Sequence, residues 1–360
     1  MPSLFDQVAL RGLTVRNRIW LAPMCQYAVD AQDGVPTDWH LVHLGARATG
    51  GFGLVFTEAS AVVPEGRISP QDVGVWNDTQ ADAWARIAGF LHDRGAAAGV
   101  QLAHAGRKAS VAAPWRGSTP VAPADGGWTA VAPSAAAFDD FVEPQALDLA
   151  GIREIVDAFA AAAVRADAAG FDTVELHGAH GYLVHQFLSP LSNLREDSYG
   201  GSFENRTRLL LEIVDAVRKV WPERKPVCVR LSATDWVEGG WTLEETCEVS
   251  QLLAGQGVDL VDVSSGGLDP RQQIEIGPGY QVPFARAVRE KAGVTTAAVG
   301  LITDPAQAQR VLDDGDADVV LLARAALREP AWPWRAAHEL GVPAENASYP
   351  PNYARGAWRS

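Results

Sequence analysis

Two histidines three residues apart are the most chemically suggestive feature of the chain. His177 and His180 follow an apolar run and precede Tyr182 in the segment VELHGAHGYLVHQFLSPLSNLREDSYGGSFENRTR, residues 174–208. Two imidazoles at this spacing can both donate N–H groups to one substrate oxygen. A nearby tyrosine, with an ordinary pKa of ~10, can donate a proton to carbon. The segment therefore predicts a site that binds an oxygen atom and delivers a proton.

Two other interpretations of the histidine pair stay open on spacing alone. The pair could bind a metal ion, which needs a third ligand, and Glu175 and Cys25 are weak candidates for it. The histidines could also be structural, with their ring nitrogens satisfied by hydrogen bonds inside the protein.

Short apolar runs that end in polar or glycine residues recur along the chain, and helical patterns follow them. The expected strands are residues 18–23, 53–60, 99–102, 172–177, 227–232, 260–264, 295–299 and 319–323. The expected helices include residues 81–95, 151–169, 203–220, 243–256, 283–291 and 305–313. Strands that alternate with helices form a parallel sheet with right-handed crossovers. About eight such units predict an α/β fold, a closed (β/α)8 TIM barrel.

Residues able to do chemistry stand at nearly every predicted strand exit. They include Cys25, Glu58, Gln101, His177, Arg230, Ser264, Ser265, Gly300 and Arg324. Barrel enzymes assemble their active sites from the loops at the carboxyl ends of the strands. The predicted fold therefore brings these residues to one face.

We expect one domain, residues 1–360, with three additions to the barrel. Residues 8–10 and 13–15 predict a β-hairpin within an N-terminal cap, 1–17, that plugs the barrel bottom. Residues 106–145, rich in proline, glycine, alanine and tryptophan, predict a long loop after the third strand that carries a short hairpin. Residues 345–360 form a C-terminal tail.

Composition narrows the class of protein. A net charge of −14 argues against a nucleic-acid partner, because phosphate binding needs a basic surface. Cys25, Cys228 and Cys247 lie far apart, which favours a reducing compartment over a structural zinc or iron–sulfur site. We find neither a signal-peptide pattern nor an apolar run of ~18 residues. We therefore expect a cytoplasmic protein with no metal and no membrane partner.

Sequence blocks along nearly the whole chain point to one family. The longest block is HGAHGYLVHQFLSPLSNLREDSYGGSFENRTR. The others are LFDQVALRGLTVRNRIWLAPMCQY, QLAHAGRKAS, VCVRLSATDW, DLVDVSSGG, PGYQVPFARAVRE, AVGLITDP and VVLLARAALREPAWPWRAA. In this order the blocks resemble the Old Yellow Enzyme family of FMN-dependent ene-reductases. Cys25, Tyr27, HAGRKA and the arginine-bearing tail resemble its bacterial thermophilic-like branch, which is similar to xenobiotic reductases. The resemblance implies tightly bound, non-covalent FMN and either NADPH or NADH as the reductant.

The resemblance also implies which residues hold the flavin. Cys25 would tune its redox potential, Gln101 would hydrogen-bond the ring, and Arg230 would stabilise the reduced ring. The remaining contacts would come from Ala22, Pro23, Met24 and Ala59 along the ring, and from Gly300, Ala323 and Arg324 at the phosphate.

Plainer roles for three of these residues stay open on their types alone. Cys25 could be a small buried hydrophobic residue. Arg230 could serve only an ion pair with a neighbouring carboxylate, and Arg324 could be an ordinary surface residue.

For the substrate, the resemblance implies a ping-pong reaction. NAD(P)H reduces FMN and leaves, and an α,β-unsaturated carbonyl compound, an enone or enal, then binds. His177 and His180 would bind its carbonyl oxygen, hydride would pass from flavin N5 to Cβ, and Tyr182 would protonate Cα. Tyr27 would be a further hydrogen-bond donor. In a homodimer or homotetramer, Arg355 and Trp358 of the tail would reach a neighbour's site.

Three alternative functions remain at this point. A related flavin barrel could dehydrogenate its substrate, or reduce nitro compounds or nitrate esters, with nearly the same residues. A flavin-free barrel would be an isomerase, an aldolase or a metal-dependent hydrolase. A non-catalytic flavin-binding scaffold is the third, although His177, His180, Tyr182 and Arg230 argue against it. The sequence has no G-x-G-x-x-G motif, so we expect no Rossmann domain.

Overall fold

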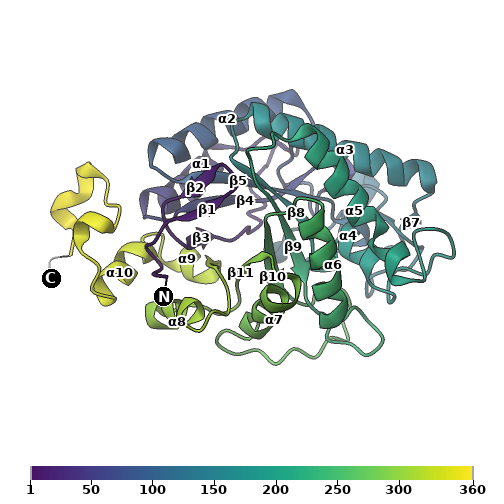
Figure 1. Cartoon of the computed structure of the whole chain (residues 1–360). Coiled ribbons are helices and arrows are strands. Elements are labelled where there is room, and N and C mark those ends of the chain that lie inside the picture. Colours follow the sequence, from purple (N-terminus) through teal and green to yellow (C-terminus); the bar gives the residue numbers. More distant parts are fainter. Residues whose placement is uncertain (1, 359–360) are drawn as a thin grey trace.

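The computed structural model describes residues 2–358 and contains a closed barrel of parallel strands (Figure 1). The hydrogen-bonded order is β10-β11-β12-β3-β4-β5-β8-β9. The barrel strands are β3 (Ile19–Leu21), β4 (Leu54–Ala61), β5 (Ala97–Ala103), β8 (Thr173–Gly178), β9 (Val227–Ser232), β10 (Leu260–Ser264), β11 (Thr295–Ala298) and β12 (Val319–Leu322). Each coincides with a predicted strand, so the (β/α)8 prediction is confirmed.

Helices lie between the strands and cover the outside of the barrel. They are α1 (Asp38–Thr49), α2 (Asp78–Asp93), α3 (Leu149–Ala168), α4 (Leu183–Leu188), α5 (Phe203–Val220), α6 (Leu243–Gly255), α7 (Val282–Ala292), α8 (Pro305–Asp313), α9 (Arg324–Arg328) and α10 (Trp332–Glu339). Local sequence explains where several of them begin. Thr242 accepts a hydrogen bond from the Glu245 backbone to start α6, and Asp304 followed by proline starts α8.

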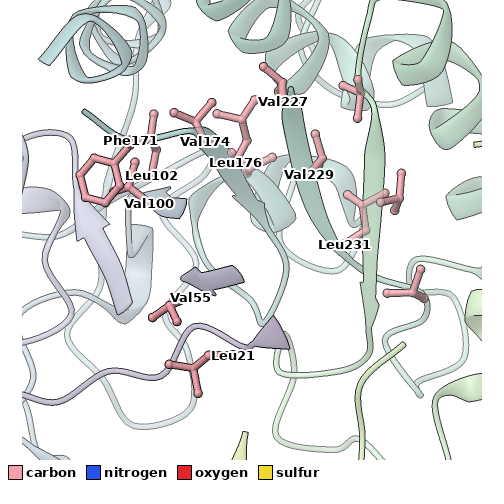
Figure 2. Close-up of a cluster of buried hydrophobic side chains, with 14 of the residues drawn as sticks. Leu21, Val55, Val100, Leu102, Phe171, Val174, Leu176, Val227, Val229 and Leu231 are labelled. Carbon is pink, nitrogen blue, oxygen red and sulfur yellow. The ribbon is translucent and has the colours of Figure 1, made fainter. Parts of the chain in front are cut away.

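The alternation of side chains along each strand separates the core from the site. Val174, Leu176, Val229 and Leu231 point outward and join the large apolar cluster between strands and helices (Figure 2). The alternate residues face into the barrel, and several of those are polar. They are Glu175 and His177 on β8, Arg230 on β9, and Asp262 and Ser264 on β10. These inward-facing polar side chains can form hydrogen bonds with a ligand bound at the strand exits.

An antiparallel hairpin, β1 (Val8–Leu10) and β2 (Leu13–Val15), precedes the barrel as predicted. Val8, Leu10 and Val15 pack in a cluster with apolar residues of the barrel interior. The hairpin turn bonds the segments just before β9 and β10, from Gly12 N to the Arg224 carbonyl (2.9 Å) and from Arg11 Nε to Asp259 (2.6 Å). The hairpin therefore closes the end of the barrel opposite the strand exits. Residue 1 of the predicted cap lies outside the described residues.

The long connection between β5 and α3 has three single-turn helices, η2 (Gly106–Lys108), η3 (Pro114–Arg116) and η4 (Pro123–Asp125), and two short strands. The two strands of this loop do not form the predicted hairpin. β6 (Val131–Ala132) and β7 (Gln145–Ala146) pair in parallel, because the chain between them crosses back before β7 begins. The antiparallel contact found in the described part of this loop is one bridge, between Val111 and Pro120.

The C-terminal tail contains η5 (Ala344–Asn346) and η6 (Pro351–Gly356) and projects beyond α10, in yellow in Figure 1. Residues 359 and 360 of the predicted tail lie outside the described residues. Within residues 2–358, every helix is too short or too polar to cross a membrane.

Candidate active site

The two histidines lie at the exit of β8 with their rings in contact. His180 Nδ1 is 3.4 Å from His177 Nε2, and the ring centroids are 5.0 Å apart. Burial, and then the positive charge of Arg230, hold the pKa of both imidazoles well below the ordinary value. Both rings are therefore neutral at pH 7, and each keeps one N–H group to donate.

The loop that carries His180 has a conformation that its neighbours enforce. His180 and Gly181 both have positive φ, +60° and +72°. A Cβ on Gly181 would lie 2.2 Å from the Gly267 carbonyl oxygen, so only glycine fits. His185 accepts a hydrogen bond from Gly181 N (2.9 Å) and contacts Asp235 at 2.8 Å, with both side chains fully buried. Sequence reasoning missed the role of His185, although its four-residue spacing from Gly181 is a local signal.

Tyr182 packs against His177, with ring centroids 5.1 Å apart, and shares one apolar cluster with Cys25 and Tyr27. Burial raises the pKa of Tyr182 well above its ordinary value, and Cys25 and Asp72 add to the shift. Burial also raises the pKa of Tyr27. Both phenols therefore carry their protons and can act as donors.

Cys25 lies in the same apolar cluster as Tyr27, and its pKa is raised well above the ordinary value. The largest cause is burial, followed by the nearby acids Asp72 and Glu58. The sulfur is therefore a protonated thiol, with properties intermediate between a small hydrophobic residue and a polar group. Its predicted contact with the flavin stays a prediction.

Lys108 also belongs to the site, although sequence reasoning gave it no catalytic or binding role. Its Nζ donates to the backbone oxygens of His180 (2.9 Å) and Gly267 (2.8 Å) and lies 5.2 Å from the Tyr182 ring centroid. Burial lowers its pKa to about 8. The ammonium therefore ties the loops after β8 and β10 together.

A cavity of about 200 Å³ opens beyond the exits of β11 and β12. Arg230, Gly300, Ala323 and Arg324 line it, together with Arg328. Its lining, in the part of the chain that the structure describes, includes no carboxylate, so the cavity suits an anion. Gly300 has φ +119° and leaves room that a Cβ would fill against Gln281. A phosphate with the adjoining part of a polyol chain fits this donor set, as the phosphate end of FMN requires.

Two polar contacts lie inside the barrel, and one of them involves Arg230, which also lines the cavity. Gln101 donates its side-chain N–H to Glu175 Oε1 (2.7 Å), and Arg230 Nε lies 2.9 Å from Asp262. The plainer role of Arg230, an ion pair with a carboxylate, is therefore real, and the same arginine also lines the cavity. Burial raises the pKa of Glu175 to about 8, with Asp262 adding to the shift. Sequence reasoning considered Glu175 only as a metal ligand.

The remaining predicted flavin contacts lie at the exits of β3 and β4. Ala22 and Ala59 are buried, and Ala59 is paired with Gln101 after an irregularity in β4. Pro23 and Met24 follow Ala22 along the chain and are half-buried. Their contact with the flavin ring stays a prediction. Among the described residues, we find no group of three His, Cys, Asp or Glu side chains that could hold a metal ion.

The structure does not bring the tail residues to the site of their own chain. Arg355 is exposed on η6, and Trp358 stacks on His338 of α10 with ring centroids 5.1 Å apart. Their predicted place in a neighbour's site stays a prediction.

Comparisons with known proteins agree on one family. Residues 3–342 match the NADH:flavin oxidoreductase / NADH oxidase family. The chain is 46% identical to an NADPH dehydrogenase of Geobacillus sp. (strain WCH70), covering 99% of this chain and 98% of that protein. It is also 46% identical to an NADPH dehydrogenase of Listeria monocytogenes over the full length of both.

Solved structures agree with the sequence comparisons. Morphinone reductase in complex with tetrahydroNAD has a TM-score of 0.78 at 30% identity, over 95% of this chain and 92% of that one. The Old Yellow Enzyme homologue from Zymomonas mobilis has a TM-score of 0.78 at 27% identity, over 100% of both chains. The chain therefore belongs to the NADH:flavin oxidoreductase / NADH oxidase family, that of the Old Yellow Enzymes, and is an oxidoreductase that uses FMN with NADPH or NADH.

Proposed function

We propose that the protein is an ene-reductase that reduces the C=C bond of α,β-unsaturated carbonyl compounds in a ping-pong reaction. The observation that carries the proposal is the neutral pair His177 and His180 with the un-ionised Tyr182 packed against it. The pair can bind an oxygen, and the phenol can supply a proton to a carbon near that oxygen. The curated relatives are NADPH dehydrogenases, which supports NADPH as the reductant.

Each residue then has a distinct task. His177 and His180 donate N–H groups to the carbonyl oxygen and stabilise the negative charge that grows there during reduction. Tyr182 holds a proton and delivers it to Cα. Tyr27 adds a donor from the loop after β3. FMN, when bound, supplies hydride to Cβ. Arg230 and Arg324 provide positive charge toward the ring and the phosphate.

We further propose that residues 1–360 are one domain and that the protein is a cytoplasmic homodimer or homotetramer. All three cysteines are free, which suits a reducing compartment. The tail projects beyond α10 (Figure 1), and Arg355 and Trp358 on it are exposed, which supports their place in a neighbour's site.

One anaerobic experiment tests the reaction. The visible spectrum of the purified holoenzyme is recorded, NADPH is added, and 2-cyclohexenone follows. We expect the flavin band to bleach with NADPH and return with the enone. A band that bleaches and does not return contradicts enone reduction and directs the search to other oxidants, nitro compounds first.

His177→Ala tests the histidine pair directly. We expect 2-cyclohexenone to bind at least about tenfold more weakly, since one of two donors to its oxygen is lost, while the ratio of FMN to protein is unchanged. Loss of FMN with unchanged enone affinity would show that His177 serves the cofactor instead.

A further inference from the structure

Ser264, the last residue of β10, contacts the ring of His180, although the two residues are 84 positions apart in sequence. Its Oγ lies 2.7 Å from His180 Nε2, and Ser264 is buried. The His180 backbone N–H donates to Ser232 Oγ at 3.0 Å, which fixes the backbone next to the ring. The ring therefore has one nitrogen, Nε2, on a serine hydroxyl and the other, Nδ1, facing His177.

The position of the proton on His180 decides what the pair can bind. The backbone N–H of Ala179 points at His177 Nδ1 (3.4 Å), so the proton of neutral His177 is on Nε2, facing His180 Nδ1. If the His180 proton were on Nε2, His180 Nδ1 would accept a hydrogen bond from His177 Nε2–H. The His177 N–H group would then not be available to a substrate. With the proton on Nδ1, both nitrogens of the 3.4 Å contact carry hydrogens, cannot bond each other, and require a shared acceptor beside them.

The surroundings of Ser264 favour the second arrangement. Its hydroxyl hydrogen has two acceptors to choose from, His180 Nε2 at 2.7 Å and Gln281 Oε1 at 3.4 Å. Gln281 Oε1 already accepts from Ser265 Oγ at 2.8 Å, and the orientation of this amide is set because its nitrogen donates to the Val299 carbonyl (3.0 Å). The Ser264 hydroxyl therefore donates to His180 Nε2, which is the nearer acceptor and has no other donor.

We propose that Ser264 is a positioning residue that donates its hydroxyl hydrogen to His180 Nε2 and so holds the His180 proton on Nδ1. His177 Nε2–H and His180 Nδ1–H, on nitrogens 3.4 Å apart, can then both donate to one atom. The inference rests on the proposed function and deepens it, because it fixes the chemical class of the bound atom. That atom is an acceptor with no hydrogen of its own, such as a carbonyl oxygen, and an alcohol oxygen is disfavoured because its hydrogen must be turned away from both donors.

The test is the tautomer of His180, read by ¹⁵N NMR of the FMN-loaded holoenzyme with ¹⁵N-labelled histidine. The chain has 8 histidines, and His180→Asn assigns the signal. We expect the Nδ1–H tautomer in the wild type with 2-cyclohexenone bound. Ser264 also lines the cavity beyond β11 and β12, so the Ser264→Ala protein is compared at the same ratio of FMN to protein as the wild type. In this variant we expect a shift toward Nε2–H and an enone dissociation constant raised about tenfold. Ser264→Thr keeps the hydroxyl and restores the wild-type tautomer.

Ser265→Ala is the companion variant, because it removes the hydroxyl that occupies Gln281 Oε1, and no hydrogen bond joins Ser265 to His180 in the described structure. We expect its tautomer and enone affinity to match the wild type, since Ser264 Oγ is 2.7 Å from His180 Nε2 and 3.4 Å from Gln281 Oε1. An Nε2–H tautomer in the enone complex, or a Ser264→Ala protein with unchanged tautomer and affinity, overturns the role of Ser264. The proposed function fails differently, if His180→Ala binds the enone as well as the wild type does.

Discussion

At the scale of single residues, the site holds several ionisable groups in their uncharged forms. Burial is the largest cause of the pKa shifts of His177, Tyr182, Cys25 and Asp72. Groups that stay neutral can exchange hydrogen bonds and protons with a neutral substrate without the cost of burying a charge. Because the pKa values of these groups differ between the folded and unfolded states, the free energy of unfolding depends on pH.

Asp72 gives the clearest pH prediction. Burial, with the nearby Glu58, raises its pKa to about 7, whereas an unfolded aspartate titrates near ~3.9. The folded state therefore binds the proton more tightly, so the free energy of unfolding falls as pH rises from about 4 to about 7. Asp72→Asn should remove this loss, on the order of 3 kcal/mol, as measured by urea denaturation across that range.

An amide in place of the Asp72 carboxyl can keep the bonds that this side chain accepts from Ile68 N, Ser69 N and Ser69 Oγ. The amide oxygen accepts from the backbone, and the serine hydroxyl can accept from the amide nitrogen. Asp82→Asn, on the exposed face of α2, is the control and should leave the pH slope unchanged. An equal slope in Asp72→Asn and the wild type would contradict the prediction.

Cys25 should react slowly with alkylating agents. Its raised pKa lowers the fraction of thiolate, the reactive form, and its partial burial limits access. We expect iodoacetamide near pH 7.5 to modify Cys25 at least about tenfold more slowly in the folded protein than in urea. Peptide mass spectrometry separates Cys25 from the other two cysteines, and equal rates in both states would refute the expectation.

At the scale of elements, α2 shows how position decides the effect of a glycine. Gly89 lies inside this helix, and a Cβ there meets no atom within 4 Å. Gly89→Ala should therefore raise the free energy of unfolding by about 0.5–1 kcal/mol. Gly95, just after the helix, has φ +74°, and Gly95→Ala should lower it. Denaturant midpoints of the two variants should move in opposite directions, and a shift of both in one direction would contradict the argument.

Strands and turns were predictable from sequence where neighbouring residues alone determine them. Alternating apolar runs predicted the barrel strands, and the residues around Arg11 and Gly12 predicted the N-terminal hairpin. The pairing of β6 with β7 was not predictable, because partners in a loop depend on where the chain crosses back. The same limit applies to the site. His177 and His180 lie within one motif, whereas Ser264 becomes their neighbour only when β8, β9 and β10 pair.

At the scale of the whole molecule, the tail predicts shared active sites. Arg355 lies on the exposed η6 segment, away from the histidines of its own chain. If it completes a neighbour's site, Arg355→Ala should lower kcat/KM for an enone about tenfold (~1.4 kcal/mol) in the oligomer. Asn352→Ala, exposed on the same segment, is the control. Kinetics combined with light scattering check the prediction, and equal kcat/KM for Arg355→Ala and wild-type oligomers would refute it.

The hairpin of β1 and β2 has a consequence for the order of events at the flavin. Because Val8, Leu10 and Val15 fill one end of the barrel, a ligand that seeks the interior must approach from the strand exits. In the proposed ping-pong reaction, the nicotinamide and the compound to be reduced would then enter by the same end of the barrel and bind in turn. We therefore expect each of the two substrates to act as a competitive inhibitor of the other when it is in excess.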